Sequence, residues 1–103
     1  MEVKLPNKIK IAGVMITIKY EDKLLENHGK YGQSRFTEGE IVLQKRDMAD
    51  DYKGQVLCHE LLHFLDRMYN NYSLEEGEVD ALATGLHALL VDMGVEFDWS
   101  EIK

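Results

Sequence analysis

The segment from Cys58 to Asp66, CHELLHFLD, constrains the fold of this chain more than any other stretch. It contains the pattern H-E-x-x-H inside a run whose apolar residues recur at helical spacing. Residues four apart lie one above the other on a helix, so the imidazoles of His59 and His63 would point to one place. Two neutral imidazoles placed in this way can share one zinc ion. Glu60 is turned about 100° round the helix from His59, which leaves its carboxylate beside the metal and free to take a proton from water.

The motif has a second interpretation, in which both histidines are core residues that hydrogen bonds satisfy and no metal is bound. Two features favour the metal. The leucines and Phe64 around the motif predict a buried helix, and paired histidines against an apolar surface are costly unless something satisfies them. Acidic residues also follow at Glu75, Glu76 and Glu78, on a second predicted helix that could supply a third ligand.

Length and composition predict one domain over residues 1–103 with a hydrophobic core, since 45% of the residues are hydrophobic. The net charge of −7 argues against a protein that mainly binds nucleic acid, which needs clustered Lys and Arg. No apolar run approaches the roughly 20 residues of a membrane span, and the N-terminus shows no signal-peptide core. The single cysteine, Cys58, excludes an internal disulfide, so we expect a cytoplasmic protein with this thiol buried.

The part of the chain before the motif predicts strands and turns. β-Branched residues in 9–20 predict two strands with a hairpin or bend at Ala12-Gly13. Residues 21–26 predict a short helical turn or a loop. Ser34–Phe36 and Ile41–Gln44 predict two further short strands. The expected fold class is therefore α+β, with an N-terminal antiparallel or mixed sheet packed on the motif helix.

The motif helix is expected to run from about Tyr52 to Tyr69, with Asp50 or Asp51 as its N-cap. Asp66, three residues after His63, is expected to pair with Arg67 or Lys53 or to be exposed, and the alternative is a helper acid close to the ligand face.

A second helix should begin near Ser73, in a capping box with Glu76, and end at Met93-Gly94. Its apolar residues recur at helical spacing and predict one buried face. These residues are Val79, Leu82, Ala83, Leu86, Leu89 and Leu90.

A zinc site that keeps one position open for water needs a third protein ligand, and three glutamates compete for that role. Glu76 has Asp80 one helical turn later, an acid that could accept the remaining ring N–H of a ligand histidine and orient it. Glu75 and Glu78 have apolar residues at that distance. Because acids in a first helical turn are also favoured by the helix dipole, Glu75 and Glu78 stay open as alternatives to Glu76.

The segments His59–His63 and Glu76–Ala83 together resemble the gluzincin pattern, H-E-x-x-H followed by E-x-x-x-D on the next helix. The chain looks most like a small phage-type member, related to the ImmA/IrrE-like metallopeptidases. This resemblance implies a small zincin-like fold, one zinc ion per chain and hydrolysis of a peptide or protein substrate. The roles that it implies are metal binding by His59, His63 and Glu76, general-base catalysis by Glu60, and support of the ligands by Asp80.

The oxyanion-stabilising residue of such enzymes has three candidates, Tyr69, Tyr72 and His87, and Tyr72 is preferred because it lies just before the ligand helix. The substrate is expected to lie extended along a sheet edge near Ile41–Gln44. The alternative function is a metal-stabilised binding module that holds a protein partner without turnover.

Overall fold

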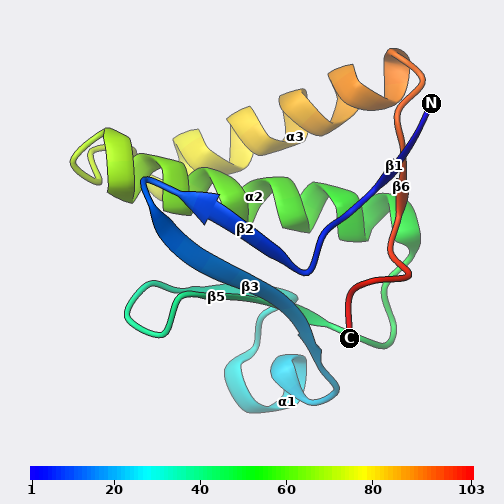
Figure 1. The fold of residues 1–103 in the computed structure, drawn as a ribbon, viewed down its shortest axis with the longest axis horizontal. Coiled ribbons are helices and arrows are strands. Elements are labelled where there is room, and N and C mark those ends of the chain that lie inside the picture. The colour runs from blue at the N-terminus through cyan, green and yellow to red at the C-terminus, as the bar shows by residue number, and fades with distance from the viewer.

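The structure is a computed structural model that describes residues 1–103. A four-stranded sheet carries one long helix on its face, and a second long helix lies against the first (Figure 1). A separate pair of short strands joins the two ends of the chain. The predicted α+β class is confirmed, and the sheet is of the mixed kind.

The main sheet has the strand order β2-β3-β5-β4. Its outer pairs, β2–β3 and β4–β5, are antiparallel, and the central pair β3–β5 is parallel. The predicted hairpin is confirmed between β2 and β3, where Ala12 and Gly13 both have positive φ angles, 50° and 78°, as a type I′ turn requires. The strands are β2 Lys8–Ile11, β3 Val14–Glu21, β4 Gly32–Arg35 and β5 Glu40–Gln44, with the short helix α1 at Leu24–His28.

Strand β5 lies inside the sheet, so the predicted substrate edge at Ile41–Gln44 is wrong. Its residues pair with β3 on one side and β4 on the other, and all but the first are buried. A continuous apolar run is what a strand covered on both faces looks like in sequence. The edge strand on the helix side of the molecule is β4 instead.

Helix α2 spans Asp50–Tyr69 and carries the H-E-x-x-H motif. Its N-cap is Ala49, without a side-chain hydrogen bond, so the prediction of Asp50 or Asp51 as N-cap is wrong by one to two residues. Both acids lie in the first turn, where the helix dipole favours negative charge.

Helix α3 spans Glu76–Asp92, and its N-cap is Glu75 rather than the predicted Ser73. Glu78 Oε1 accepts a hydrogen bond from the backbone N–H of Glu75 at 2.8 Å, as the third residue of a capping box does. The end at Met93-Gly94 is confirmed, with Gly94 at a φ of 83°.

Asp66 organises the connection between the two helices, contrary to the expectation of an exposed or base-paired acid. It is buried, and its carboxylate accepts hydrogen bonds from the backbone N–H groups of Ser73 and Leu74 and from the amide of Asn70. Ser73 is therefore part of the turn and not the start of the helix.

The hydrophobic core lies between the sheet and α2, where Leu57 and Phe64 are fully buried. Cys58 is also buried, as expected, and burial raises the pKa of its thiol. Helix α3 packs against α2 along one side only. The prediction of one buried apolar face on α3 is therefore only partly right. Val79 and Ala83 are buried, but Leu82, Leu86 and Leu89 are 54%, 41% and 56% exposed.

The chain ends form a small parallel pair, β1 (Glu2–Lys4) with β6 (Glu96–Asp98). The sequence gives no sign of β1, because two of its three residues are charged. Phe97 and Trp99, at the end of the chain, pack against the hydrophobic core. None of the helices has the length and apolar character that crossing a bilayer requires.

Candidate metal centre

His59 and His63 lie one turn apart on α2 and point to the same place, as the sequence predicts. Their Nε2 atoms are 3.1 Å apart, and both rings are largely withdrawn from solvent. The helical phase alone fixes this convergence, because α2 is regular throughout the motif.

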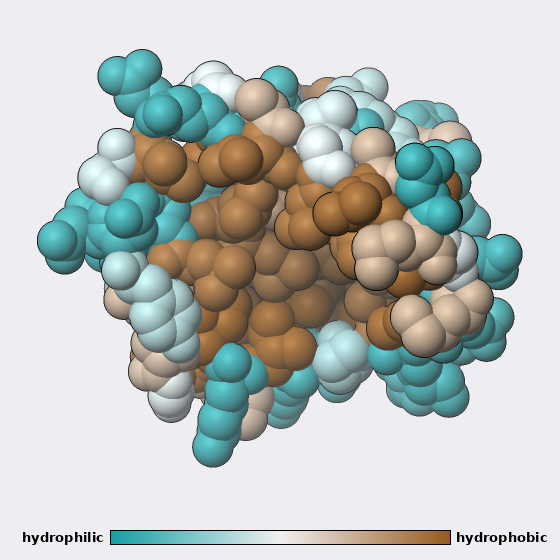
Figure 2. Space-filling view, turned by 90° about the horizontal axis from the view of Figure 1, so that it is seen from above, coloured by the Kyte–Doolittle hydropathy of each residue, from teal (hydrophilic) through white to brown (hydrophobic).

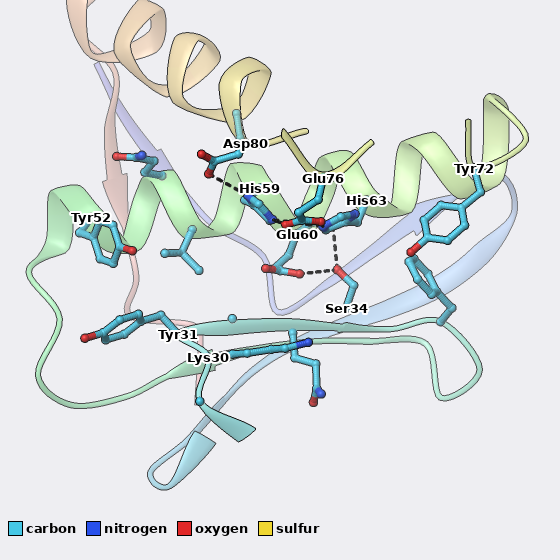
Figure 3. Close-up of a pocket in the computed structure, with 17 residues that line it drawn as sticks. Lys30, Tyr31, Ser34, Tyr52, His59, Glu60, His63, Tyr72, Glu76 and Asp80 are labelled. Atoms are coloured by element: carbon cyan, nitrogen blue, oxygen red, sulfur yellow. Dashed lines mark hydrogen bonds and ion pairs between the residues drawn. The ribbon is translucent and has the colours of Figure 1, made fainter. Parts of the chain in front are cut away.

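Glu76 completes a group of three possible metal ligands (Figure 3). It is the first residue of α3, and the tight turn that Asp66 holds brings it over the two histidines. Its Oε1 is 2.8 Å from His59 Nε2, and its Oε2 is 3.1 Å from His63 Nε2. Of the three competing glutamates, Glu76 is the one in this group, while Glu75 and Glu78 form the N-terminal cap of α3.

The geometry of this group fits a small divalent cation. Two ligand atoms that each lie about 2.0–2.1 Å from a tetrahedral zinc ion are roughly 3.3 Å apart. The two Nε2 atoms are 3.1 Å apart, and each lies 2.8–3.1 Å from a different carboxylate oxygen of Glu76. With one ligand atom taken from each residue, the three atoms lie within 4.8 Å of one another. Two ring nitrogens that face one another and a carboxylate need a proton or a cation between them, because their lone pairs otherwise repel.

Asp80 lies behind His59, in the place that the sequence predicts. Its Oδ1 is 3.5 Å from His59 Nδ1, which is long for a hydrogen bond but on the side where an orienting acceptor belongs. His63 has no such acceptor, because its Nδ1 is buried without a partner. The two histidines are therefore supported unequally.

Glu60 faces the cleft beside the three ligand candidates, and its side chain is nearly buried, with the residue 7% exposed. Desolvation raises the pKa of this carboxyl above its usual value, while the bond to Ser34 and the charges of His59 and His63 oppose that rise. A carboxylate whose pKa is raised toward neutrality is a better proton acceptor at neutral pH than an exposed one.

Strand β4 holds Glu60 in place, a contact that was not predicted from the sequence. The Ser34 hydroxyl lies 2.8 Å from Glu60 Oε1 and 3.0 Å from the Glu60 carbonyl oxygen. Two residues earlier, Gly32 lies on the same face of the strand, and a Cβ there would be 2.5 Å from Val56 Cγ1 and 3.0 Å from Glu60 Oε2. Small residues at alternate positions are the only signal in the sequence, and they mark a strand face that approaches another element closely.

The centre lies in a cleft of about 630 Å³ between β4 and the two helices. Aromatic pairs stand at its two ends, Tyr31 with Tyr52 at a centroid distance of 5.5 Å and Phe36 with Tyr72 at 5.6 Å. The three ligand candidates thus lie between two aromatic pairs that line the same cleft.

The three candidates for an oxyanion-stabilising residue occupy different places. Tyr72 lines the cleft and has a positive φ of 53°, an uncommon conformation for a bulky residue that its neighbours must maintain. The hydroxyl of Tyr69 accepts a hydrogen bond from the backbone N–H of Ala12 in the β2–β3 hairpin. His87 packs against Phe97 in a separate pocket.

Comparison of the chain with protein-family models, with curated proteins and with solved structures gave no match.

Proposed function

We propose that this chain is a zinc-dependent metallopeptidase with a minimal zincin-like fold. The observation that carries the proposal is the convergence of His59, His63 and Glu76 on one point, with the carboxyl of Glu60 beside them in the same cleft. This arrangement combines three ligands, an open position and a general base. The proposed setting is the cytoplasm, where a single buried thiol such as Cys58 stays reduced.

The chain's own residues supply a complete set of roles for peptide hydrolysis. A bound zinc ion supplies Lewis-acid polarisation of the scissile carbonyl and makes water more acidic. Glu60 takes the proton of the attacking water and gives it to the leaving amine. While Glu60 is protonated, its O–H donates to Ser34 Oγ, and the Ser34 hydroxyl donates to the Glu60 carbonyl oxygen. Tyr72 is the proposed donor to the developing oxyanion.

The proposed substrate is an extended peptide segment that lies along the edge of β4. Residues 29–34 line the cleft, so a chain paired with this edge would cross the metal ligands. Backbone hydrogen bonds of this kind bind a segment with little dependence on its sequence. The edge at β4 replaces the edge at Ile41–Gln44 that the sequence suggested.

The second candidate is the binding module, in which the metal only fastens α3 to α2 and a partner is held without turnover. The observation that favours it is the exposed apolar surface on α3. The buried position of Glu60 favours the enzyme, because a structural metal needs no proton acceptor beside it.

Zinc should raise the stability of the chain, because it binds the folded site and the unfolded chain does not preserve that site. Saturating zinc is expected to add on the order of 3–4 kcal/mol to the free energy of unfolding. Thermal melts with zinc and with EDTA measure this effect. His63→Ala should abolish it, and His28→Ala, which removes an exposed histidine of α1, should leave it intact. Equal melting temperatures of the wild type with zinc and with EDTA would refute the metal site.

Replacing Ser34 should shift the pH dependence of cleavage. The hydrogen bond from Ser34 lowers the pKa of Glu60, so Ser34→Ala raises that pKa further. Because the base acts only when deprotonated, the acid limb of the pH–activity profile should move to higher pH. Ser34→Thr, which keeps the hydroxyl, should restore the wild-type profile. An acid limb that stays in place in Ser34→Ala would show that Ser34 does not tune the base.

A further inference from the structure

A row of large apolar side chains on α3 is exposed, and no other part of the chain covers it. Leu82, Leu86 and Leu89 follow one another at spacings of four and three residues, so they form one stripe along the helix. Each is 41% exposed or more. Leucines scattered singly on a surface need no explanation, but a row of them along one helix marks an interaction site.

The neighbouring side of α2 extends this surface. Leu65 is 42% exposed, and Leu61, one turn before it, is half-buried. Figure 2 shows hydrophobic residues gathered around a hollow on the face seen from above, the side on which α3 lies. We call the surface formed by Leu61, Leu65, Leu82, Leu86 and Leu89 the apolar groove.

The apolar groove lies on the opposite side of both helices from the metal centre. Leu61 and Leu65 are each two residues from a motif histidine, which places them roughly 160° round α2 from those side chains. On α3 the stripe lies roughly 130° from the side that carries Glu76 and Asp80. A molecule bound in the groove would therefore leave the cleft open.

The charged side chains that α3 presents beside the groove have one sign. Helix α3 contains no Lys or Arg. Glu78 lies four residues before Leu82, and Asp92 lies three residues after Leu89, so exposed carboxylates stand beside the stripe at both of its ends. On the neighbouring strand β2, Lys8 and Lys10 alternate with Ile9 and Ile11, which places the lysines on the opposite face of the sheet from the core.

We propose that the apolar groove binds an amphipathic helix of a partner protein, with leucine-like anchors at helical spacing and basic residues flanking them. The apolar stripe requires anchors at positions i, i+3, i+4 and i+7, and the carboxylates at its ends require cations opposite them. A second copy of the chain would place another α3 without Lys or Arg against this one, and the carboxylates of the two helices would repel. An anionic membrane surface would meet the same carboxylates and a net charge of −7. This inference does not depend on the proposed peptidase activity.

The test uses the full chain and two fluorescein-labelled 18-residue probe peptides with the same helical leucine pattern. One peptide carries lysine at its polar positions and the other carries glutamate. In fluorescence anisotropy, the lysine peptide is expected to bind the wild type saturably and at least tenfold more tightly than the glutamate peptide. It is also expected to gain helicity on binding.

Two variants separate the groove from general attraction to an acidic protein. The double variant Leu82→Gln/Leu86→Gln keeps every charge, and its affinity for the lysine peptide should be at least tenfold lower than that of the wild type. Val91→Gln changes an exposed residue on the far side of the same helix and should leave binding within twofold of wild type. Equal melting temperatures show that both variants are folded.

Four results would overturn the proposal. Equal binding of the two peptides would mean that charge does not select the partner, and unchanged binding in the double variant would mean that the groove is not the site. A wild-type dimer in sedimentation velocity that the double variant dissociates would assign the groove to a second copy. Wild-type binding to phosphatidylglycerol vesicles in preference to the lysine peptide would assign it to a lipid surface.

Discussion

Glu60→Gln is expected to lower the rate of peptide cleavage by at least about 10²-fold, the usual scale of general-base catalysis. Glutamine has the shape of glutamate and can still accept the hydrogen bond of Ser34, which lies 2.8 Å from Glu60 Oε1. It has no carboxylate to take a proton from the attacking water. The substitution therefore removes one chemical step and leaves the surrounding packing intact.

The same variant should bind zinc as the wild type does. Glu60 is not among the three residues whose ligand atoms converge, so the ligand set is unchanged. Metal content by mass spectrometry and cleavage of fluorescein-labelled casein, measured on one preparation, give both quantities. Loss of zinc from Glu60→Gln would mean that Glu60 is a ligand. Absence of any cleavage by the zinc-loaded wild type, across a broad panel of unfolded substrates, would favour the binding module.

Glu76→Ala is expected to weaken zinc binding by more than about 10²-fold. Removing an orienting residue behind a ligand typically costs about 10–100-fold in metal affinity, and Glu76 is itself a proposed ligand. Its two carboxylate oxygens lie 2.8 and 3.1 Å from the histidine nitrogens, so alanine leaves two ligands where the site needs three. Asp80→Ala should lie between Glu76→Ala and the wild type, because Asp80 reaches the site only through His59. Competition with a fluorescent zinc chelator measures these affinities.

Glu78→Ala is the matched control for Glu76→Ala, since it removes an acid from the same helical turn. It should leave zinc affinity nearly unchanged and lower the free energy of unfolding by about 0.5–2 kcal/mol, because Glu78 caps the backbone N–H of Glu75. Glu76→Ala is thus expected to lower zinc affinity, whereas Glu78→Ala is expected to lower the free energy of unfolding. If Glu78→Ala releases the metal and Glu76→Ala does not, the assignment of the third ligand is wrong.

Local patterns in the sequence correctly predicted the features that depend on a single helix or turn. The direction shared by His59 and His63 follows from the helical repeat, and the turn at Ala12-Gly13 follows from residues that tolerate positive φ. The end of α3 is likewise set by a residue that tolerates positive φ, Gly94. Each of these depends on backbone geometry over a few residues, which the residue types determine directly.

Helix starts and exposure were predicted less well, because contacts from elsewhere in the chain decide them. Ser73 has the residue type of an N-cap, but the buried carboxylate of Asp66 takes its backbone N–H and keeps it in the turn. Leu86 has the spacing of a buried residue, but α3 packs on α2 along one side only. Helical periodicity shows that an apolar face exists and does not show what covers it.

The sequence by itself determined the two histidines, the adjacent glutamate and a short set of candidates for the third ligand. Only the tertiary structure placed Glu76, among those candidates, together with the two histidines and brought Ser34 and Gly32 against Glu60. The physical reason is the range of the contacts. His59 and His63 belong to one rigid helix, whereas Ser34 reaches Glu60 from a strand 26 residues away in the sequence, and that approach depends on how the whole core packs between α2 and the sheet.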